Sequence, residues 1–288
     1  MPRLGAAIGV LVACAGTSLI PLVHARSLMV VDLRKEVRQS YEGKLLLLKQ
    51  PSCFDVLHFD GDGLLTRRPA GEPWTTCGLL RAEKVELRDG QITIDGARVI
   101  VALNQGSKTG KLDPVTTDRQ VHVAIEMPRP PRDSGDLTAI LSRVFSKELA
   151  RRMAEAWHAD VDLSKGMNDA SIGPVDGRIG TLEGDRAVYS WQSGIVTKPR
   201  ALYKPGPSYP PNALLKKVAG TIQVRVVINE NGFPEILEAV QHLREGLDAR
   251  ALWAVSQWRF ERPLKDGKGA ATMVLVDVKF HLPGKKKK

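Results

Sequence analysis

Residues 207–282 constrain the fold more than any other part of the chain. From Gly220 onward apolar and mostly polar residues alternate, which is typical of a half-buried strand whose core face is Ile222, Val224, Val226 and Ile228. Asn231-Gly232 then supplies a turn that tolerates positive φ. A second strand around 236–241 should return antiparallel, and residues 273–282 alternate again. The sequence therefore predicts three strands in one antiparallel sheet.

Two helices are predicted beside these strands. Leu247, Ala251, Val255 and Trp258 recur at helical spacing, and Asp248 lies near the helix start, where a carboxylate complements the dipole. A shorter helix is expected over 211–217. We therefore expect this region to be α+β, a three-stranded antiparallel sheet with two helices, and such a sheet has two open edges that could pair with another strand.

Three segments in this order resemble the C-terminal domain of TonB-type energy transducers: 207–213, 220–232 and the Trp258-Arg259-Phe260 run with Pro263. The resemblance implies a periplasmic domain that binds an extended segment of an outer-membrane receptor by strand addition. It implies that the partner-binding residues are Tyr209, Pro210, Met273, Val274, Leu275, Val276, Asp277, Val278 and Lys279. The structural positions that we expect are Gly220, Gly232, Trp258, Phe260 and Pro263.

The chain also departs from that family. The family's membrane helix places a Ser and a His one turn apart to couple to the proton-driven motor, whereas Ser18 and His24 are six residues apart. Gly206 and Ser208 stand where amides that contact receptors are common. Two functions therefore stay open: a transducer that supports energised transport across the outer membrane, with inner-membrane motor proteins as further partners, and a periplasmic adaptor or cell-wall-associated module that transmits no force.

Residues 1–25 have the composition of an export segment. The chain is apolar from Leu4 to Val23 and reaches Val23-His24-Ala25, a pattern that suits signal-peptidase cleavage before Arg26. The alternatives are an uncleaved inner-membrane anchor and lipidation at Cys14, which follows Leu11-Val12-Ala13. Each alternative places the protein in the periplasm or cell envelope.

The remaining residues favour a binding protein without a cofactor. Cys53 and Cys77 are the only cysteines outside the leader, and in an oxidising compartment the pair suggests a disulfide, with two separate buried thiols as the alternative. The histidines are dispersed, with no spacing typical of a zinc site, and no catalytic constellation can be assembled. We expect no enzyme activity, no metal and no cofactor.

The net charge of +10 includes the terminal run of four lysines, residues 285–288. Aromatic residues are only 5% of the chain and scattered, which argues against nucleic acid as a partner, whereas contact with an anionic membrane surface or the cell wall fits the charge.

The first half predicts a separate strand-rich domain. Val85 and Leu87 face Ile92 and Ile94 across Asp89-Gly90, a strong hairpin signal, and a helical stripe runs from about Asp136 to Trp157. We expect residues 26–158 to form a strand-rich domain with flanking helices, 159–200 a linker, 201–283 the TonB-like domain and 284–288 a basic tail.

Overall fold

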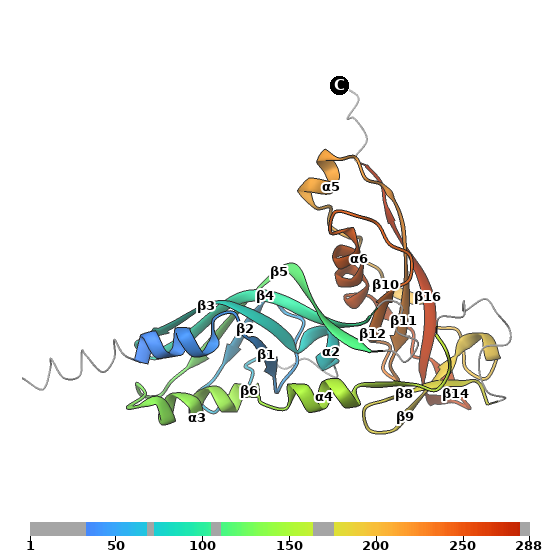
Figure 1. Cartoon of the computed structure of the whole chain (residues 1–288). Helices are drawn as coiled ribbons and strands as arrows, with labels where there is room; N and C mark the ends of the chain where they lie inside the picture. Colours follow the sequence, from blue (N-terminus) through green and yellow to red (C-terminus); the bar gives the residue numbers. More distant parts are fainter. Residues whose placement is uncertain (1–32, 68–71, 105–110, 164–175, 283–288) are drawn as a thin grey trace, which may run out of the picture.

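The computed structural model describes residues 33–67, 72–104, 111–163 and 176–282. These residues form a mixed α and β structure in which the C-terminal strands stand at a steep angle to the N-terminal strands of the same sheet (Figure 1). Within these ranges no helix has the length and apolar composition needed to cross a membrane. The leader, 1–25, and the basic tail lie outside the described residues.

The N-terminal part is rich in strands, as expected. Residues 33–41 are helical and are followed by β1 (Leu45–Leu48), β2 (Val56–Phe59), the short helix α2 (Trp74–Cys77), β3 (Leu79–Arg88), β4 (Gln91–Leu103) and β5 (Leu112–Glu126). The β3–β4 hairpin turns at Asp89-Gly90, where Arg88 pairs with Gln91. β2 pairs parallel to β5, and β5 pairs antiparallel to β4.

Gly96 lies inside β4. A Cβ on this glycine would stand 2.2 Å from the carbonyl oxygen of Arg81 on β3, where the β3–β4 register shifts. The missing side chain therefore permits a close approach of the two strands.

The helix expected from Asp136 to Trp157 is interrupted. α3 (Ser134–Val144) ends where Phe145 adopts an extended conformation, and β6 (Phe145–Ser146) pairs with β1 before α4 (Leu149–Glu155) begins. The Asp133 side chain accepts a hydrogen bond from the Asp136 N–H at 2.8 Å and caps α3. Pairing with β1 thus outweighs the local helical pattern.

The C-terminal part contains the two helices and three strands predicted from its sequence pattern: α5 (Pro211–Leu215), β11 (Gly220–Ile228), β12 (Pro234–Ala239), α6 (Leu247–Ser256) and β16 (Ala271–Phe280). It also contains four short strands that were not predicted: β10 (Ala201–Tyr203), β13 (Arg259–Phe260), β14 (Leu264–Lys265) and β15 (Lys268–Gly269). β11 lies between β12 and β16 and is antiparallel to both. β10 pairs with β13, and β14 with β15.

The expectation of a separate three-stranded sheet with two open edges is corrected by the strand order. The sheet runs β6-β1-β3-β4-β12-β11-β16-β9-β8-β7, with β5 and β2 attached at β4. On one side Leu237 of β12 pairs with Ala102 of β4. On the other side Ala271, Thr272 and Met273 of β16 pair with β9. The three strands are therefore the middle of a longer sheet.

The strand that pairs with β16 comes from the segment expected to be a linker. β7 (Trp157–Ala159), β8 (Arg178–Leu182) and β9 (Arg186–Ser190) form an antiparallel group, and a 3-10 helix, η1 (Trp191–Ser193), follows directly. The chain turns away from β16 at η1, so that β9 covers only the first residues of that edge.

The core is shared between the two parts of the chain. Val99 and Val101 of β4 and Trp74 of α2 pack in one cluster with Val227 of β11 and Met273 of β16. A second cluster lies under α6 and includes Trp258 and Phe260, and a third belongs to the N-terminal part. The apolar contact between the two parts is therefore continuous.

Candidate functional site

A groove of about 790 Å³ runs along the part of β16 that β9 leaves uncovered. Its floor is β16 from Val274 to Lys279 with Gln223 of β11 beside it. The remaining lining residues come from η1, from the segment that leads to α5 and from the residues that follow α6: Trp191, Gln192, Lys198, Pro199, Ala201, Lys204, Pro205, Gly206, Pro207, Trp258 and Phe260.

The main-chain groups of alternate β16 residues point into this groove. The Gln223 carbonyl accepts a hydrogen bond from the Val240 N–H at 2.8 Å, so the main-chain groups of Gln223 face β12. Gln223 stands opposite Asp277, and in an antiparallel pair whose first member faces away, the second also faces away. The N–H and C=O groups of Asp277, and by alternation those of Leu275 and Lys279, therefore point away from β11.

β9 already satisfies the same groups at the start of the strand. Met273 pairs with Ser190, and its side chain is fully buried. Beyond Met273 no described strand pairs with this side of β16. Of the seven strand residues implied by the family resemblance, Met273 to Lys279, the structure brings the six from Val274 onward into the groove and pairs Met273 with the chain itself.

Two lysine–tryptophan contacts form the walls of the groove. The Lys198 ammonium lies 4.1 Å from the centre of the Trp191 ring, and Lys204 lies 4.5 Å from the centre of the Trp258 ring. The Trp258 Nε1–H donates to the Pro205 carbonyl at 3.1 Å, which ties the wall to the end of α6. In each of these cation–π contacts an ammonium group covers one face of the indole ring.

Tyr209 and Pro210, which the resemblance places among the partner-binding residues, lie outside the groove lining. The Tyr209 hydroxyl donates to the Val218 carbonyl, and its ring meets Phe280 edge-on with the ring centres 5.5 Å apart. Pro210 precedes the first residue of α5. Both residues therefore fix how the chain enters α5 and how α5 sits on the sheet.

The positions expected to be structural occupy tight or buried places. Gly232 has a φ of 86°, and a Cβ there would stand 2.2 Å from the Phe260 carbonyl oxygen. Gly220 begins β11 opposite Phe280. Trp258 and Phe260 are buried, and the Pro263 carbonyl accepts from the Ala270 N–H at 2.9 Å.

Sequence reasoning did not find the groove walls. Trp191, Lys198 and Lys204 belong to the stretch 191–207, which has no strand or helix periodicity. The composition of the stretch 191–207 is the signal that could have identified these wall residues. An aromatic residue with several lysines and prolines near an expected open strand edge is typical of a peptide-binding groove.

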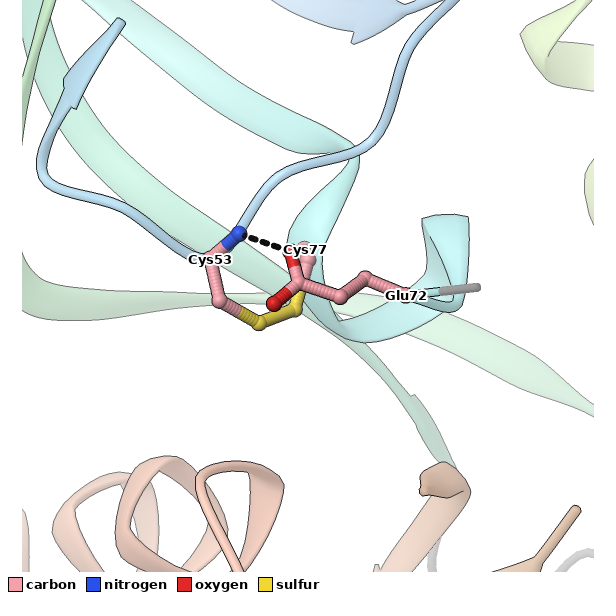
Figure 2. Close-up of side chains that lie close together, drawn as sticks. All are labelled: Cys53, Glu72 and Cys77. Carbon is pink, nitrogen blue, oxygen red and sulfur yellow. Dashed lines mark hydrogen bonds between the residues drawn. A yellow bond between two sulfur atoms is a disulfide. The ribbon is translucent and has the colours of Figure 1, made fainter. Parts of the chain in front are cut away.

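Cys53 and Cys77 are joined in a disulfide that links the segment before β2 to α2 (Figure 2). The Glu72 carboxylate lies beside the sulfur atoms and accepts a hydrogen bond from the Cys53 N–H at 2.7 Å. These three side chains are close enough to share one metal ion, but a zinc site needs free thiolates, and the disulfide removes both.

A buried arginine supports the two disulfide segments. The Arg98 guanidinium is fully buried and donates to the Cys77 carbonyl at 2.8 Å and to the Phe54 carbonyl at 2.7 Å. Burial lowers the pKa of Arg98 to about 10, against the opposite effect of Asp55 and Glu72. The group therefore remains a cation at neutral pH and holds the two segments together by charge-assisted hydrogen bonds.

The C-terminal part of the chain matches a known family. Residues 205–282 match the family model described as Gram-negative bacterial TonB protein C-terminal. Among solved structures, the chain is similar to the solution NMR structure of the Pseudomonas aeruginosa TonB CTD, at 21% identity and a TM-score of 0.25, over 30% of this chain and 91% of that chain. A comparison with curated proteins finds no match. Residues 205–282 therefore belong to the TonB C-terminal domain family.

Proposed function

We propose that this chain is a TonB-like cell-envelope protein whose groove binds an extended segment of an outer-membrane receptor by strand addition and so supports energised transport. The observation that carries the proposal is the row of outward-pointing main-chain groups at Leu275, Asp277 and Lys279 beside the groove. Affinity would come mainly from main-chain hydrogen bonds, and specificity from side chains that meet the walls.

β9 covers the first part of the β16 edge and so limits the length of a peptide that can pair with the rest. The pairing of β9 with β16 ends where Ser190 lies opposite Met273. A bound peptide could therefore form main-chain hydrogen bonds with β16 only from Val274 to the end of the strand at Phe280. A short extended peptide of about six residues would fill this length, since each strand residue advances about 3.3 Å. A longer strand would have to displace β9 or leave the sheet.

The proposal is tested by proline at the outward-facing position Asp277. Asp277→Pro removes one N–H that points into the groove and leaves the ladder to β11 intact, because that ladder uses the neighbouring residues. Losing one main-chain hydrogen bond costs about 1 kcal/mol, or about fivefold in affinity, before any clash of the ring with the guest is added. Calorimetry with receptor plug peptides measures the change.

The matched control is Asp277→Ala, which removes the same exposed side chain and its contact with Gln223 but keeps the N–H. We expect its affinity to equal that of the unchanged protein. Amide hydrogen exchange gives a second readout: the peptide should protect Leu275, Asp277 and Lys279 and leave Ala271 and Met273, which already face β9, unchanged. Equal affinities for the proline and alanine variants would refute strand addition here.

One observation favours the alternative function, an adaptor or cell-wall-associated module that transmits no force. The C-terminal domain is fastened to the N-terminal part: the Thr75 hydroxyl donates to the Glu235 carbonyl, and Arg259 lies 3.7 Å from the Glu72 carboxylate. A domain held in this way is suited to presenting a bound peptide at a fixed place.

The mature N-terminus separates the two functions. A protein that retains Met1 could remain anchored and contact the motor proteins of the inner membrane, whereas a protein that begins at Arg26 could not itself connect that membrane to a receptor. Mass spectrometry of the protein purified from the cell envelope gives the answer directly, and a start at Arg26 would eliminate the transducer function.

A further inference from the structure

The groove beside β16 carries an excess of positive charge. Among the described residues that line it, the ionisable side chains are the cations Lys198, Lys204 and Lys279 and the acid Asp277, and all four are exposed. Asp277 accepts a hydrogen bond from the Gln223 amide at 3.4 Å. None of the three lysines forms an ion pair with a carboxylate in the described part of the chain. The groove therefore has cations that its own residues leave available to a bound peptide.

One face of the β16 edge has mixed charge. Val278 belongs to the apolar cluster under α6, and Val276 packs against it. The alternating residues Asp277 and Lys279 therefore lie on the opposite face of the strand. An acid and a base two residues apart on this face favour neither sign of charge in a neighbouring strand. We expect this face to select no peptide by its charge.

The face toward α6 presents two cations. Lys198 and Lys204 lie over the rings of Trp191 and Trp258, and both rings pack in or against the cluster under α6. Each ring holds its lysine against the wall, while the exposed ammonium group keeps N–H donors for a further partner. A cation that is already held in place loses less freedom when it pairs with a carboxylate. This wall is therefore preorganised for negative charge.

We propose that the groove selects an acidic peptide, one whose carboxylate side chains alternate along the face that points toward α6. The proposal rests on strand addition at β16, the proposed function. Every second side chain of a paired strand points to the same face, so glutamate or aspartate at positions i and i+2 of the peptide would both point toward the wall that carries Lys198 and Lys204. Both lysines precede residue 205, where the family match begins, so the family resemblance does not imply this selection.

The experiment compares three blocked hexapeptides of threonine and valine that carry glutamate, glutamine or lysine at their second and fourth positions. Calorimetry measures their binding to protein produced from Arg26, which retains every residue that the structure describes and lacks the apolar leader. We expect the glutamate peptide to bind about tenfold more tightly than the glutamine peptide, and the lysine peptide to bind most weakly. This preference should shrink between about 50 mM and about 500 mM salt, because exposed charges are screened.

Substitutions at the wall assign the preference to its two lysines. Lys198→Gln combined with Lys204→Gln should reduce the ratio of the glutamate to the glutamine affinity to about one. Arginine at both positions retains the charge and the contact with the ring, so it should retain the preference. The matched control replaces Lys44 and Lys147 with glutamine. Both are exposed in the N-terminal part and lie outside the groove, so the net charge falls by the same amount while the preference should remain.

The possible results separate this proposal from strand addition. Equal affinities for the glutamate and glutamine peptides, both weakened by Asp277→Pro, would overturn charge selection and leave strand addition standing. Failure of all three peptides to bind would refute strand addition and this proposal together. A preference for the lysine peptide would also overturn the proposal, as would a preference for glutamate that persists when Lys198 and Lys204 are both glutamine.

Discussion

The disulfide between Cys53 and Cys77 offers a quantitative test of how this fold is stabilised. The two residues are separated by 24 positions, so the bridge closes a loop of about 25 residues in the unfolded chain. Restricting a loop of that length is worth about 3 kcal/mol of folding free energy on chain-entropy estimates. Replacing both cysteines with alanine should therefore lower the free energy of unfolding by about this amount.

The structure indicates that this loss arises in the unfolded chain. The hydrogen bond from the Cys53 N–H to Glu72 and the two from Arg98 to carbonyl groups involve no sulfur atom, so they persist in the variant. The tryptophan bands of the near-ultraviolet circular dichroism spectrum should be unchanged in the folded state, while the dependence of unfolding on urea should steepen because the unfolded chain expands.

Urea unfolding of protein produced from Arg26, with and without the two substitutions, measures the difference. Cys53→Ala alone should lose as much stability as the double variant, because either substitution opens the loop. A loss below about 1 kcal/mol would refute the loop-closure argument, and altered tryptophan bands would assign the pair a role in native packing.

Two further predictions concern the C-terminal part. Gly232→Ala should lower stability in thermal unfolding clearly more than Gly184→Ala. Both glycines have positive φ, so an alanine at either position costs about 1 kcal/mol, but only at Gly232 would the new Cβ also meet a carbonyl oxygen, that of Phe260. Equal losses would contradict this contact. Burial raises the pKa of Glu238 above its ordinary value of 4.5, against the lowering effect of Arg225. The folded state therefore holds this proton more tightly, and the group's contribution to stability falls as the pH rises above about 4.5. Glu238→Gln should make the decline in stability between pH 4.5 and 7 shallower, and parallel curves for the two proteins would contradict this assignment.

The elements that were predicted well depend on local periodicity. The alternation of Ile222 to Ile228 and the turn at Asn231-Gly232 specify β11 and its pairing with β12, because side-chain period and turn chemistry act over a few residues. The helical spacing of Leu247 to Val255 likewise specifies α6. The family resemblance added the significance of the β16 edge, which periodicity alone does not provide.

What could not be predicted depends on pairing between distant segments. Ala187 to Ser190 carries no stronger strand signal than many loops, and its pairing with β16 is favoured by a shared core, in which Val188 meets Ala271 and Met273. The same reason explains the break after α3, where Phe145 joins β1. Tertiary contacts of this kind override local propensity and leave no periodic trace in the sequence.

The parallel pairing of β9 with β16 also determines what an autonomous fragment must contain. A polypeptide begun at residue 205, where the family match starts, would lack Val188 and its neighbours and would expose the side chains of Ala271 and Met273 to water. It would also leave the edge of β16 open for three more residues than in the whole chain, so a peptide affinity measured on such a truncation would describe a different strand edge.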